Sequence, residues 1–261
     1  MTNLPFFFGS NVYFEFILII LLSFSIVYLG IKQVEFSRNF NERNKLIIFG
    51  FVFGIMIFSI IDMFKGASNL GVEFGIRFPI VQLSLLISFI IGLLIPSLFE
   101  INNITKFDQN YLRLSYLFAL GIGFHSFSEG VVISLNLLAG YNFTLLQRTT
   151  QTMSFLLHKF SEGLIISIPL LFVTTNISKT IFNLALISIL PIILGSMFGF
   201  LGINGSITSY FFSAGAGSLT YILYKIGRIS NNIPERRIIY LGIVIGILYM
   251  YFSGIIHSIE F

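Results

Sequence analysis

The sequence predicts an all-α polytopic membrane protein. Hydrophobic residues make up 56% of the 261 positions and charged residues only 10%, whereas soluble globular proteins carry about 25% charged residues. The mean hydropathy is +0.93. The apolar residues form continuous runs of about 20, which is long enough for a helix to cross a bilayer. These runs lack the polar–apolar alternation of a membrane β-barrel.

Eight such runs follow one another, separated by polar or turn-forming clusters. They cover Tyr13–Ile31, Leu46–Phe64, Ile80–Phe99, Leu112–Leu138, Thr152–Val173, Ile181–Leu201, Ile207–Ile226 and Ile238–Ile256. We expect each run to be one transmembrane helix and residues 1–261 to form one transmembrane domain. The N-terminus lacks the basic region of a cleavable signal peptide, so the first run is interpreted as a retained span.

The basic residues alternate between the loops that connect these runs. The first, third, fifth and seventh loops and their helix starts carry Lys32, Arg38, Arg43, Lys45, Lys106, Arg113, Lys179, Lys225, Arg228, Arg236 and Arg237. The even-numbered loops carry only Lys65, Arg77 and Arg148. Because Lys and Arg are enriched in cytoplasmic loops, the odd loops are predicted to be cytoplasmic. Both termini are then outside, in a protein of the cell membrane.

Composition also excludes several kinds of partner. The chain has no cysteine, so it has neither disulfides nor a thiolate metal site. Its net charge of +4 comes from short loops between apolar runs, which does not indicate a nucleic-acid partner. We expect the lipid bilayer to surround the protein and no cofactor to be bound. The sequence leaves the oligomeric state open, a homodimer included.

A six-residue motif occurs twice, in the fourth and fifth runs. It reads His125-Ser-Phe-Ser-Glu129-Gly130 in one and His158-Lys-Phe-Ser-Glu162-Gly163 in the other. Residues four apart share a helix face, so each histidine is expected beside its glutamate. Ionisable groups are costly inside a membrane and mark functional sites. Two imidazoles and two carboxylates together suit a divalent transition metal, although a hydrogen-bond network that only joins helices remains the structural alternative.

Lys159 follows the second histidine of this repeat and precedes Glu162 by three residues. Its flexible stem can therefore reach the carboxylates. At about 4 Å and an effective dielectric of about 20, an ammonium and a carboxylate attract by about 4 kcal/mol. One metal, two carboxylates and one ammonium leave a net charge of about +1, whereas a second metal raises it to about +3. We therefore expect one metal in the site.

The remaining polar and small residues allow more than one interpretation. Gly130 and Gly163 are typical of close helix packing or of space for a ligand, and Ser128 and Ser161 can either bond to their own helix or line a pore. The small-residue stretch 213–218 predicts close helix approach.

Isolated charges occur near the predicted span ends. Asp62 precedes Lys65 there, and the two either form an interfacial ion pair or have separate roles. Glu15 and Glu100 are expected to be solvated. His257 and Glu260, at the C-terminus, are a weak candidate for a peripheral metal contact.

At these residues the sequence resembles the ZIP family of divalent-metal transporters. The family has similar histidine- and acid-containing motifs in spans four and five. The resemblance implies a bundle of three, two and three helices with both termini outside. It also implies a metal site formed by Met56, His125, Glu129, His158 and Glu162. At the positions of the family's second metal site this chain has Ser126, Lys159 and Leu190, so Ser126 and Lys159 are expected to modulate the single site.

The sequence therefore predicts a transporter, not an enzyme. Its substrate is expected to be Zn²⁺, with Fe²⁺, Mn²⁺ or Cd²⁺ as alternatives, because imidazole and carboxylate ligands do not separate these metals. Alternating access around a site near the membrane midplane is the expected mechanism. An intramembrane metalloenzyme is one alternative, but it needs an activated water and a separate general base. A transporter-like metal sensor is the other.

Overall fold

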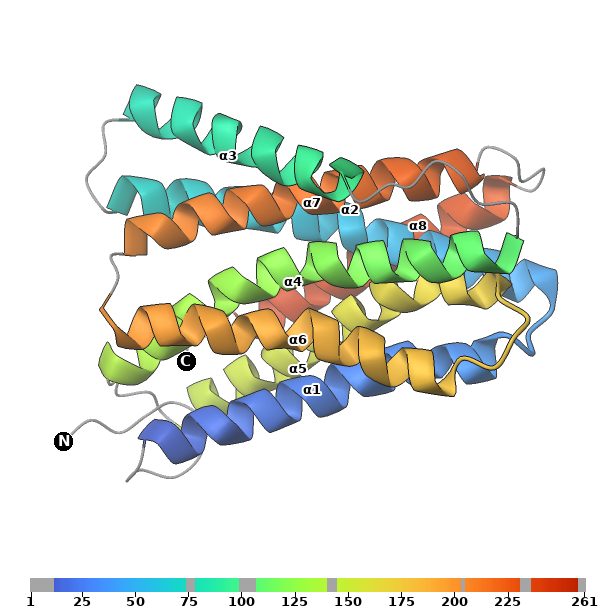
Figure 1. Cartoon of the computed structure of the whole chain (residues 1–261), viewed down its shortest axis with the longest axis horizontal. Helices are drawn as coiled ribbons and strands as arrows, with labels where there is room; N and C mark the ends of the chain where they lie inside the picture. The colour runs from blue at the N-terminus through green and yellow to red at the C-terminus, as the bar shows by residue number, and fades with distance from the viewer. Residues whose placement is uncertain are drawn as a thin grey trace.

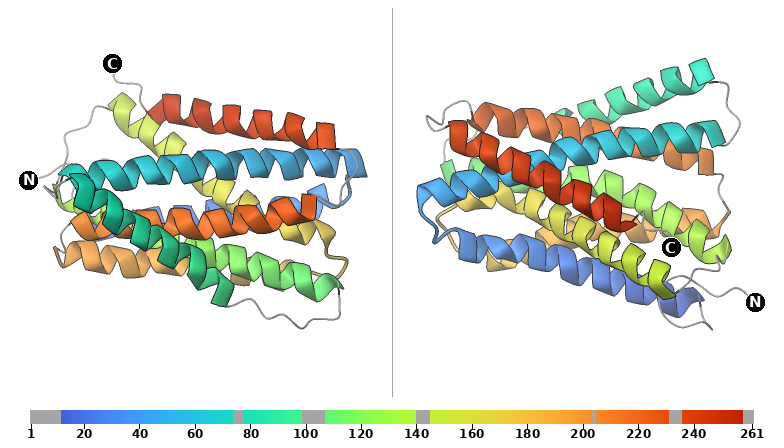
Figure 2. Two further views of the ribbon diagram at one scale, coloured as in Figure 1. Left: turned by 90° about the horizontal axis from the view of Figure 1, so that it is seen from above. Right: turned by 180° about the vertical axis from the view of Figure 1, so that it is seen from behind.

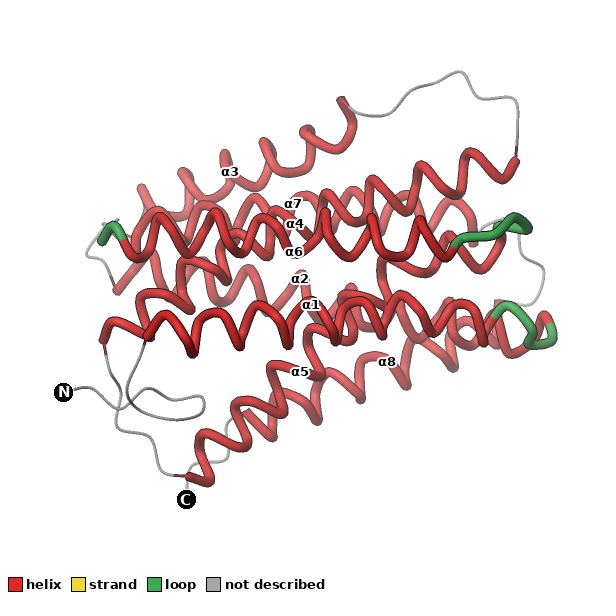
Figure 3. The backbone as a smooth tube through the Cα atoms, turned by 60° about the horizontal axis from the view of Figure 1, so that its bottom comes forward, coloured by secondary structure: helices red, strands yellow, loops and turns green. Residues whose placement is uncertain are grey.

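The computed structural model describes residues 12–73, 78–98, 107–139, 145–202, 205–230 and 236–257. Within these ranges the chain is helical apart from short turns and contains no strand (Figures 1 and 3). The helices are α1 (Val12–Ser37), α2 (Glu42–Glu73), α3 (Phe78–Leu98), α4 (Phe107–Ala139), α5 (Leu145–Ser167), the 3₁₀ helix η1 (Ile168–Phe172), α6 (Ser178–Phe200), α7 (Gly205–Ser230) and α8 (Arg236–His257). The all-α prediction is confirmed, and each of the eight predicted runs falls on a helix.

Several helices extend beyond the apolar runs that predicted them. α2 continues to Glu73, although the apolar run ends at Phe64, so Asp62 lies well inside the helix. That Asp62 lies near the end of the membrane-crossing part of α2 stays a prediction. α5 ends at Ser167, and Pro169 lies in the 3₁₀ turn that follows. Proline lacks the backbone N–H that an α-helix needs in its interior, which explains the change of helix type.

Seven of the described helices are long and apolar enough to cross a membrane, and α7 is the exception. With 26 residues α7 is long enough, but serine, glycine and alanine dilute its hydrophobic residues. Its residues 213–219 are all buried. A helix that is surrounded by other helices does not need the apolar surface that lipid requires, which explains the composition of α7.

The helices pair in a regular pattern. The main pairs are α1 with α5, α4 with α6, α2 with α8 and α3 with α7, and α2 also packs against α7. The two halves of the chain pair in the same way. If α1, α2 and α3 are exchanged in order with α6, α7 and α8, and α4 with α5, each main pair becomes another main pair and α2–α7 stays the same. This is the predicted arrangement of three, two and three helices. The start of α1 and the last turn of α8 lie at the same end of the bundle (Figures 1 and 2).

The glycines that end the two motifs allow α4 and α5 to approach their neighbours closely. A Cβ atom on Gly130 would collide with the carbonyl oxygen of Ile192 in α6. A Cβ atom on Gly163 would collide with the carbonyl oxygen of Val27 in α1 and would lie 2.9 Å from the Cα atom of Gly30. The packing interpretation of both glycines is confirmed.

The small-residue stretch of α7 also packs closely, as predicted. Ser213 donates a hydrogen bond to the Leu85 carbonyl of α3 at 2.7 Å, and Ser218 donates one to the Gly121 carbonyl of α4 at 3.0 Å. A Cβ atom on Gly215 would lie 3.2 Å from the Cα atom of His125. α7 therefore supports the part of α4 that carries the first motif.

Candidate metal centre

Four side chains from the two motifs converge between α4 and α5. Within each helix, the predicted neighbours are close: His125 Nε2 lies 3.6 Å from Glu129 Oε1, and His158 Nε2 lies 3.3 Å from Glu162 Oε1. Between the helices, the two Nε2 atoms are 3.1 Å apart, and each also lies 3.6–3.7 Å from the glutamate Oε1 of the other helix. We call these four residues the four-ligand group.

The spacing of these atoms suits a small tetrahedral cation. Each residue of the group offers one ligand atom within 4.8 Å of all the others. Zn²⁺ binds imidazole nitrogen and carboxylate oxygen at about 2.0–2.2 Å, which places tetrahedral ligand atoms about 3.4 Å from one another. The two imidazole nitrogens lie 3.1 Å apart and 3.3–3.7 Å from the glutamate Oε1 atoms, on both sides of that value, and all four ligand atoms lie within 4.8 Å of one another. Two nitrogen and two oxygen donors can therefore hold one such ion with little movement.

Lys159 completes the charge balance of the group. It is fully buried, and its Nζ atom donates to Glu129 Oε2 and to Glu162 Oε2, the latter at 2.8 Å. Glu129 therefore turns Oε2 toward the ammonium and Oε1 toward the imidazoles, whereas both oxygens of Glu162 accept from the ammonium, Oε1 at 2.9 Å. The prediction that Lys159 reaches the carboxylates is confirmed. With neutral imidazoles, the assembly carries one net negative charge, which a bound cation would compensate.

The four ligands are not equally buried. The side chains of His125 and Glu162 are 5% and 3% exposed, whereas those of Glu129 and His158 are 12% and 23% exposed. The deeper pair therefore has one member on each helix. A cation reaching the group from solvent meets Glu129 and His158 first.

α7 positions His125. The imidazole packs against Phe212 with ring centroids 5.8 Å apart, and Gly215 leaves room for the backbone of α4. Metal-bound histidines usually donate their second ring N–H to another group. In the described part of the chain, the buried Nδ1 atom of His125 has no hydrogen-bond partner. Packing against α7, not a second hydrogen bond, therefore orients this ring.

The motif serines mostly bond to their own helices. Ser128 Oγ donates to the His125 carbonyl at 2.6 Å, and Ser161 Oγ donates to the Leu157 carbonyl at 2.8 Å. The interpretation of these two as own-helix hydrogen-bond donors is therefore the right one. Ser126 Oγ is buried and has no partner among the described residues. A modulating role for Ser126 stays a prediction.

The thioether ligand predicted in α2 remains untested. Met56 is fully buried in the main hydrophobic core, and its role as a weak fifth ligand stays a prediction. Met63, which the sequence analysis did not single out, packs its terminal methyl group against Gly215, next to His125. The two methionines are seven residues apart and so share a helix face, which is the signal that could have identified Met63.

One expectation about charged residues needs correction, and one open alternative is decided. Glu15 is buried, not solvated, because aromatic residues of the first turns of α1 pack against Phe200 at the end of α6. The structure shows both Asp62 and Lys65 exposed, with no ion pair between them. Glu100, Glu260 and the side chain of His257 lie outside the described residues.

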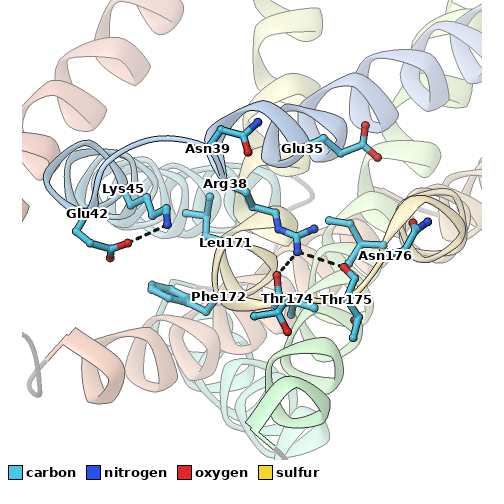
Figure 4. A pocket seen from close by; sticks show the side chains of 12 residues that line it. Glu35, Arg38, Asn39, Glu42, Lys45, Leu171, Phe172, Thr174, Thr175 and Asn176 are labelled. Carbon is cyan, nitrogen blue, oxygen red and sulfur yellow. Dashed lines mark hydrogen bonds and ion pairs between the residues drawn. The ribbon is translucent and has the colours of Figure 1, made fainter.

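A separate pocket of about 700 Å³ lies where the α1–α2 turn meets the segment between η1 and α6 (Figure 4). Arg38 donates to the Val173 carbonyl and, at 3.2 Å, to that of Thr175. Lys45 pairs with Glu42 at 2.9 Å. None of the four ligands lines this pocket, which therefore belongs to the end of the bundle and not to the metal centre.

Comparison of the chain with models of protein families and with curated proteins finds no match. The similarity to ZIP transporters therefore stays a prediction. The function has to be inferred from the geometry of the four-ligand group and its surroundings.

Proposed function

We propose that this protein transports a divalent transition metal ion, with Zn²⁺ as the leading candidate, across a membrane. The observation that carries the proposal is the four-ligand group itself, which lies between two helices of a membrane bundle and has donors spaced for one tetrahedral ion. Imidazole and carboxylate are the ligands that zinc combines in proteins without thiolates. Fe²⁺, Mn²⁺ and Cd²⁺ remain alternative substrates.

The buried lysine favours reversible binding of the metal. A structural metal site with two buried carboxylates would be left with uncompensated charge when empty, which is strongly destabilising. In this protein Lys159 already holds both carboxylates through hydrogen bonds. The site can therefore be empty without a large loss of stability, as every transport cycle requires.

The same geometry argues against an enzyme. A catalytic zinc typically has three protein ligands and keeps a position open for water or substrate. Here four protein donors surround the central position, and both glutamates are also held by Lys159. Neither carboxylate is then free to act as the general base that hydrolysis would need.

The bundle offers a route for alternating access. The four-ligand group lies between α4 and α5, and three helices on each side can move relative to this pair. Four basic residues lie near one end of the bundle: Arg38 in the turn after α1, Arg43 and Lys45 in the first turn of α2, and Lys179 at the start of α6. By the positive-inside rule this end is cytoplasmic. The sequence contains no nucleotide-binding motif, so transport is downhill or driven by the membrane potential.

Uptake of radioactive zinc into proteoliposomes tests this function. We expect the wild-type protein to accumulate zinc and Glu162→Ala to lose uptake, because Glu162 supplies both a ligand and a partner for Lys159. Glu42→Ala is the matched control, since Glu42 is exposed and forms its ion pair with Lys45, away from the four-ligand group. Equal zinc flux in wild type and Glu162→Ala would refute the proposal. Zinc binding without flux in the wild type would indicate a sensor.

A further inference from the structure

The half of α2 that lies beyond Met56 exposes three polar side chains along one stripe. Asp62, Lys65 and Asn69 are all exposed, although they belong to a helix that is apolar enough to span a membrane. Steps of three or four residues along a helix stay on one face, so these three side chains point in similar directions. This is unusual for a surface that would otherwise meet lipid.

Asp62 lies near the middle of the bundle in depth. The next residue, Met63, contacts Gly215 of α7, which lies against His125 of the four-ligand group. Gly215 follows the start of α7 at Gly205 by ten residues, and with 1.5 Å per residue this is about 15 Å. The hydrocarbon core of a bilayer is about 30 Å thick. Asp62 therefore lies near the depth of the candidate metal centre, and on α2 it precedes the end of the apolar stretch Glu42–Asn69 by seven residues, or about 10 Å.

The departure of α8 from α2 explains why this stripe is exposed. In the first half of α2, Gly50 and Gly54 pack directly against the backbone of α8 at Ile239 and Ile243. Four and eight residues beyond Gly54, the same stripe reaches Phe58 and then Asp62. α8 no longer covers it there, because α8 crosses α2 and ends beside α5 (Figure 2, right).

Contacts at the far end of α8 confirm that it leaves α2 for α5. Tyr249 donates to the Leu157 carbonyl at 3.2 Å, and Ser154 of α5 donates to the Ser253 carbonyl at 3.2 Å. α5 also contacts α2. On α5 lies His158, the most exposed of the four ligands. The stripe of Asp62 and the exposed side of the four-ligand group thus belong to helices that are in contact.

We propose that Asp62 lines a water-filled approach to the four-ligand group and binds the incoming divalent cation before it reaches His158. A carboxylate at the depth of the bilayer centre is too costly to face lipid, and such residues line ion pathways. Asp62 offers a single carboxylate, which suits a transient cation contact. The long stem of Lys65 lets its ammonium reach toward the outer surface and away from Asp62. This inference rests on the proposed transport function.

Thiol accessibility tests the water-filled approach without depending on transport. The chain has no cysteine, so Asp62→Cys introduces the only thiol. The matched control is Ile90→Cys: Ile90 is exposed on α3 and follows Phe89, which packs against Phe64 of α2 at the same depth. Both proteins are placed in liposomes and treated with the membrane-impermeant cation 2-(trimethylammonium)ethyl methanethiosulfonate. Modification is followed by mass spectrometry of the intact protein.

We expect Asp62→Cys to react about tenfold faster or more than Ile90→Cys, because the reactive thiolate forms in water and not in lipid. Added Zn²⁺ should slow the reaction of Asp62→Cys. Equal, slow reaction of both proteins would overturn the proposal. Oxidative cross-linking of Asp62→Cys into dimers would overturn it as well, since the stripe would then be covered by a second copy of the chain.

The cation contact has its own test. Asp62→Asn should raise the half-saturating zinc concentration for uptake about tenfold, because the lost attraction to a divalent ion is sizeable even in water. The amount of zinc bound per protein should stay at the wild-type value. Unchanged half-saturation would overturn the cation contact. If Asp62→Cys is modified fast but the wild-type protein shows no zinc uptake, the transport function is refuted and the water-filled approach is still supported.

Discussion

α4 and α5 carry the same motif but differ at its second position. On α4 this residue is Ser126, and on α5 it is Lys159. Both are fully buried, yet the serine hydroxyl finds no described partner, whereas the ammonium bonds to the glutamates of both helices. The repeated residues supply equivalent ligands, and the one that is not repeated supplies a resident positive charge. We therefore expect the number of metal ions to depend on this difference between the motifs.

The helices also differ in which ligand they bury. α4 buries its histidine and leaves its glutamate partly accessible, whereas α5 does the opposite. The reason lies in their neighbours: α7 packs against His125 through Gly215 and Phe212, and the described α5 contacts are with α1, α2, α4, α8 and η1 instead. Two nearly identical sequences therefore have one inner and one outer histidine.

The largest expected effect comes from an acidic residue at the second position of the α5 motif. Lys159→Asp removes the resident ammonium and adds a carboxylate, so the group with one divalent ion bound would still carry about one negative charge and would attract a second ion. We expect two zinc ions per protein where the unmodified protein binds one, as measured by mass spectrometry of the intact protein. Without zinc, this variant should lose about 3–5 kcal/mol of stability, because the buried glutamates lose their partner.

A charge swap is the control for Lys159→Asp. The double variant Ser126→Lys, Lys159→Ser moves the ammonium to α4, three residues before Glu129, where it has the same spacing to a glutamate. One zinc ion per protein is expected again. Two adjacent zinc ions in the unmodified protein would contradict this account of Lys159.

The next largest effect should come from the glycines that end the motifs. In Gly163→Ala the new methyl group would meet the backbone of α1, and in Gly130→Ala it would meet the backbone of α6. Overpacking typically costs about 1–3 kcal/mol, and a backbone neighbour cannot rotate away, so we expect losses at the upper end. Thermal unfolding in detergent measures this cost.

Gly66→Ala is the control for both glycine variants. No described atom lies within 4 Å of a Cβ atom at that position, so alanine should be tolerated and gain up to about 1 kcal/mol of helix propensity. If Gly163→Ala were as stable as Gly66→Ala, close contact between α5 and α1 would not be needed.

A moderate effect should separate the two histidines. Diethyl pyrocarbonate modifies accessible neutral imidazoles, and the His158 side chain is 23% exposed against 5% for His125. We expect His158 to react several times faster, and zinc to protect both rings. Peptide-resolved mass spectrometry gives the two rates separately. Equal rates would show that α7 does not shield His125. A lack of protection by zinc would show that neither histidine binds the metal.

The smallest effect is expected for Ser126→Ala. A buried hydroxyl without a hydrogen-bond partner costs about 1–3 kcal/mol, so its removal should leave stability unchanged or slightly raise it. Ser128→Ala is the control, since that hydroxyl bonds to the His125 carbonyl and its loss should cost about 1 kcal/mol. Thermal unfolding compares the two. A large fall in zinc affinity for Ser126→Ala would instead assign Ser126 a direct role at the site.

Much of the fold and the ligand set follows from local sequence. Apolar runs long enough to span a membrane must be helical there, because the backbone has no water to bond with. A histidine and a glutamate four residues apart share a face of any helix, which is why His125 pairs with Glu129 and His158 with Glu162. These features depend on one segment at a time. The helix ends were less predictable, since α2 continues through polar residues that tertiary contacts support.

The tertiary structure decided everything that depends on which helices are neighbours. Lys159 could be expected near Glu162 from spacing alone, but its bond to Glu129 required α4 and α5 to meet at the same depth. The polar helix α7 is buried because other helices surround it, and Glu15 is buried because α6 ends beside the start of α1. Asp62 is exposed at the depth of the metal centre because α8 turns away from α2 toward α5. Helix periodicity indicates which residues share a face, but only packing determines what that face meets.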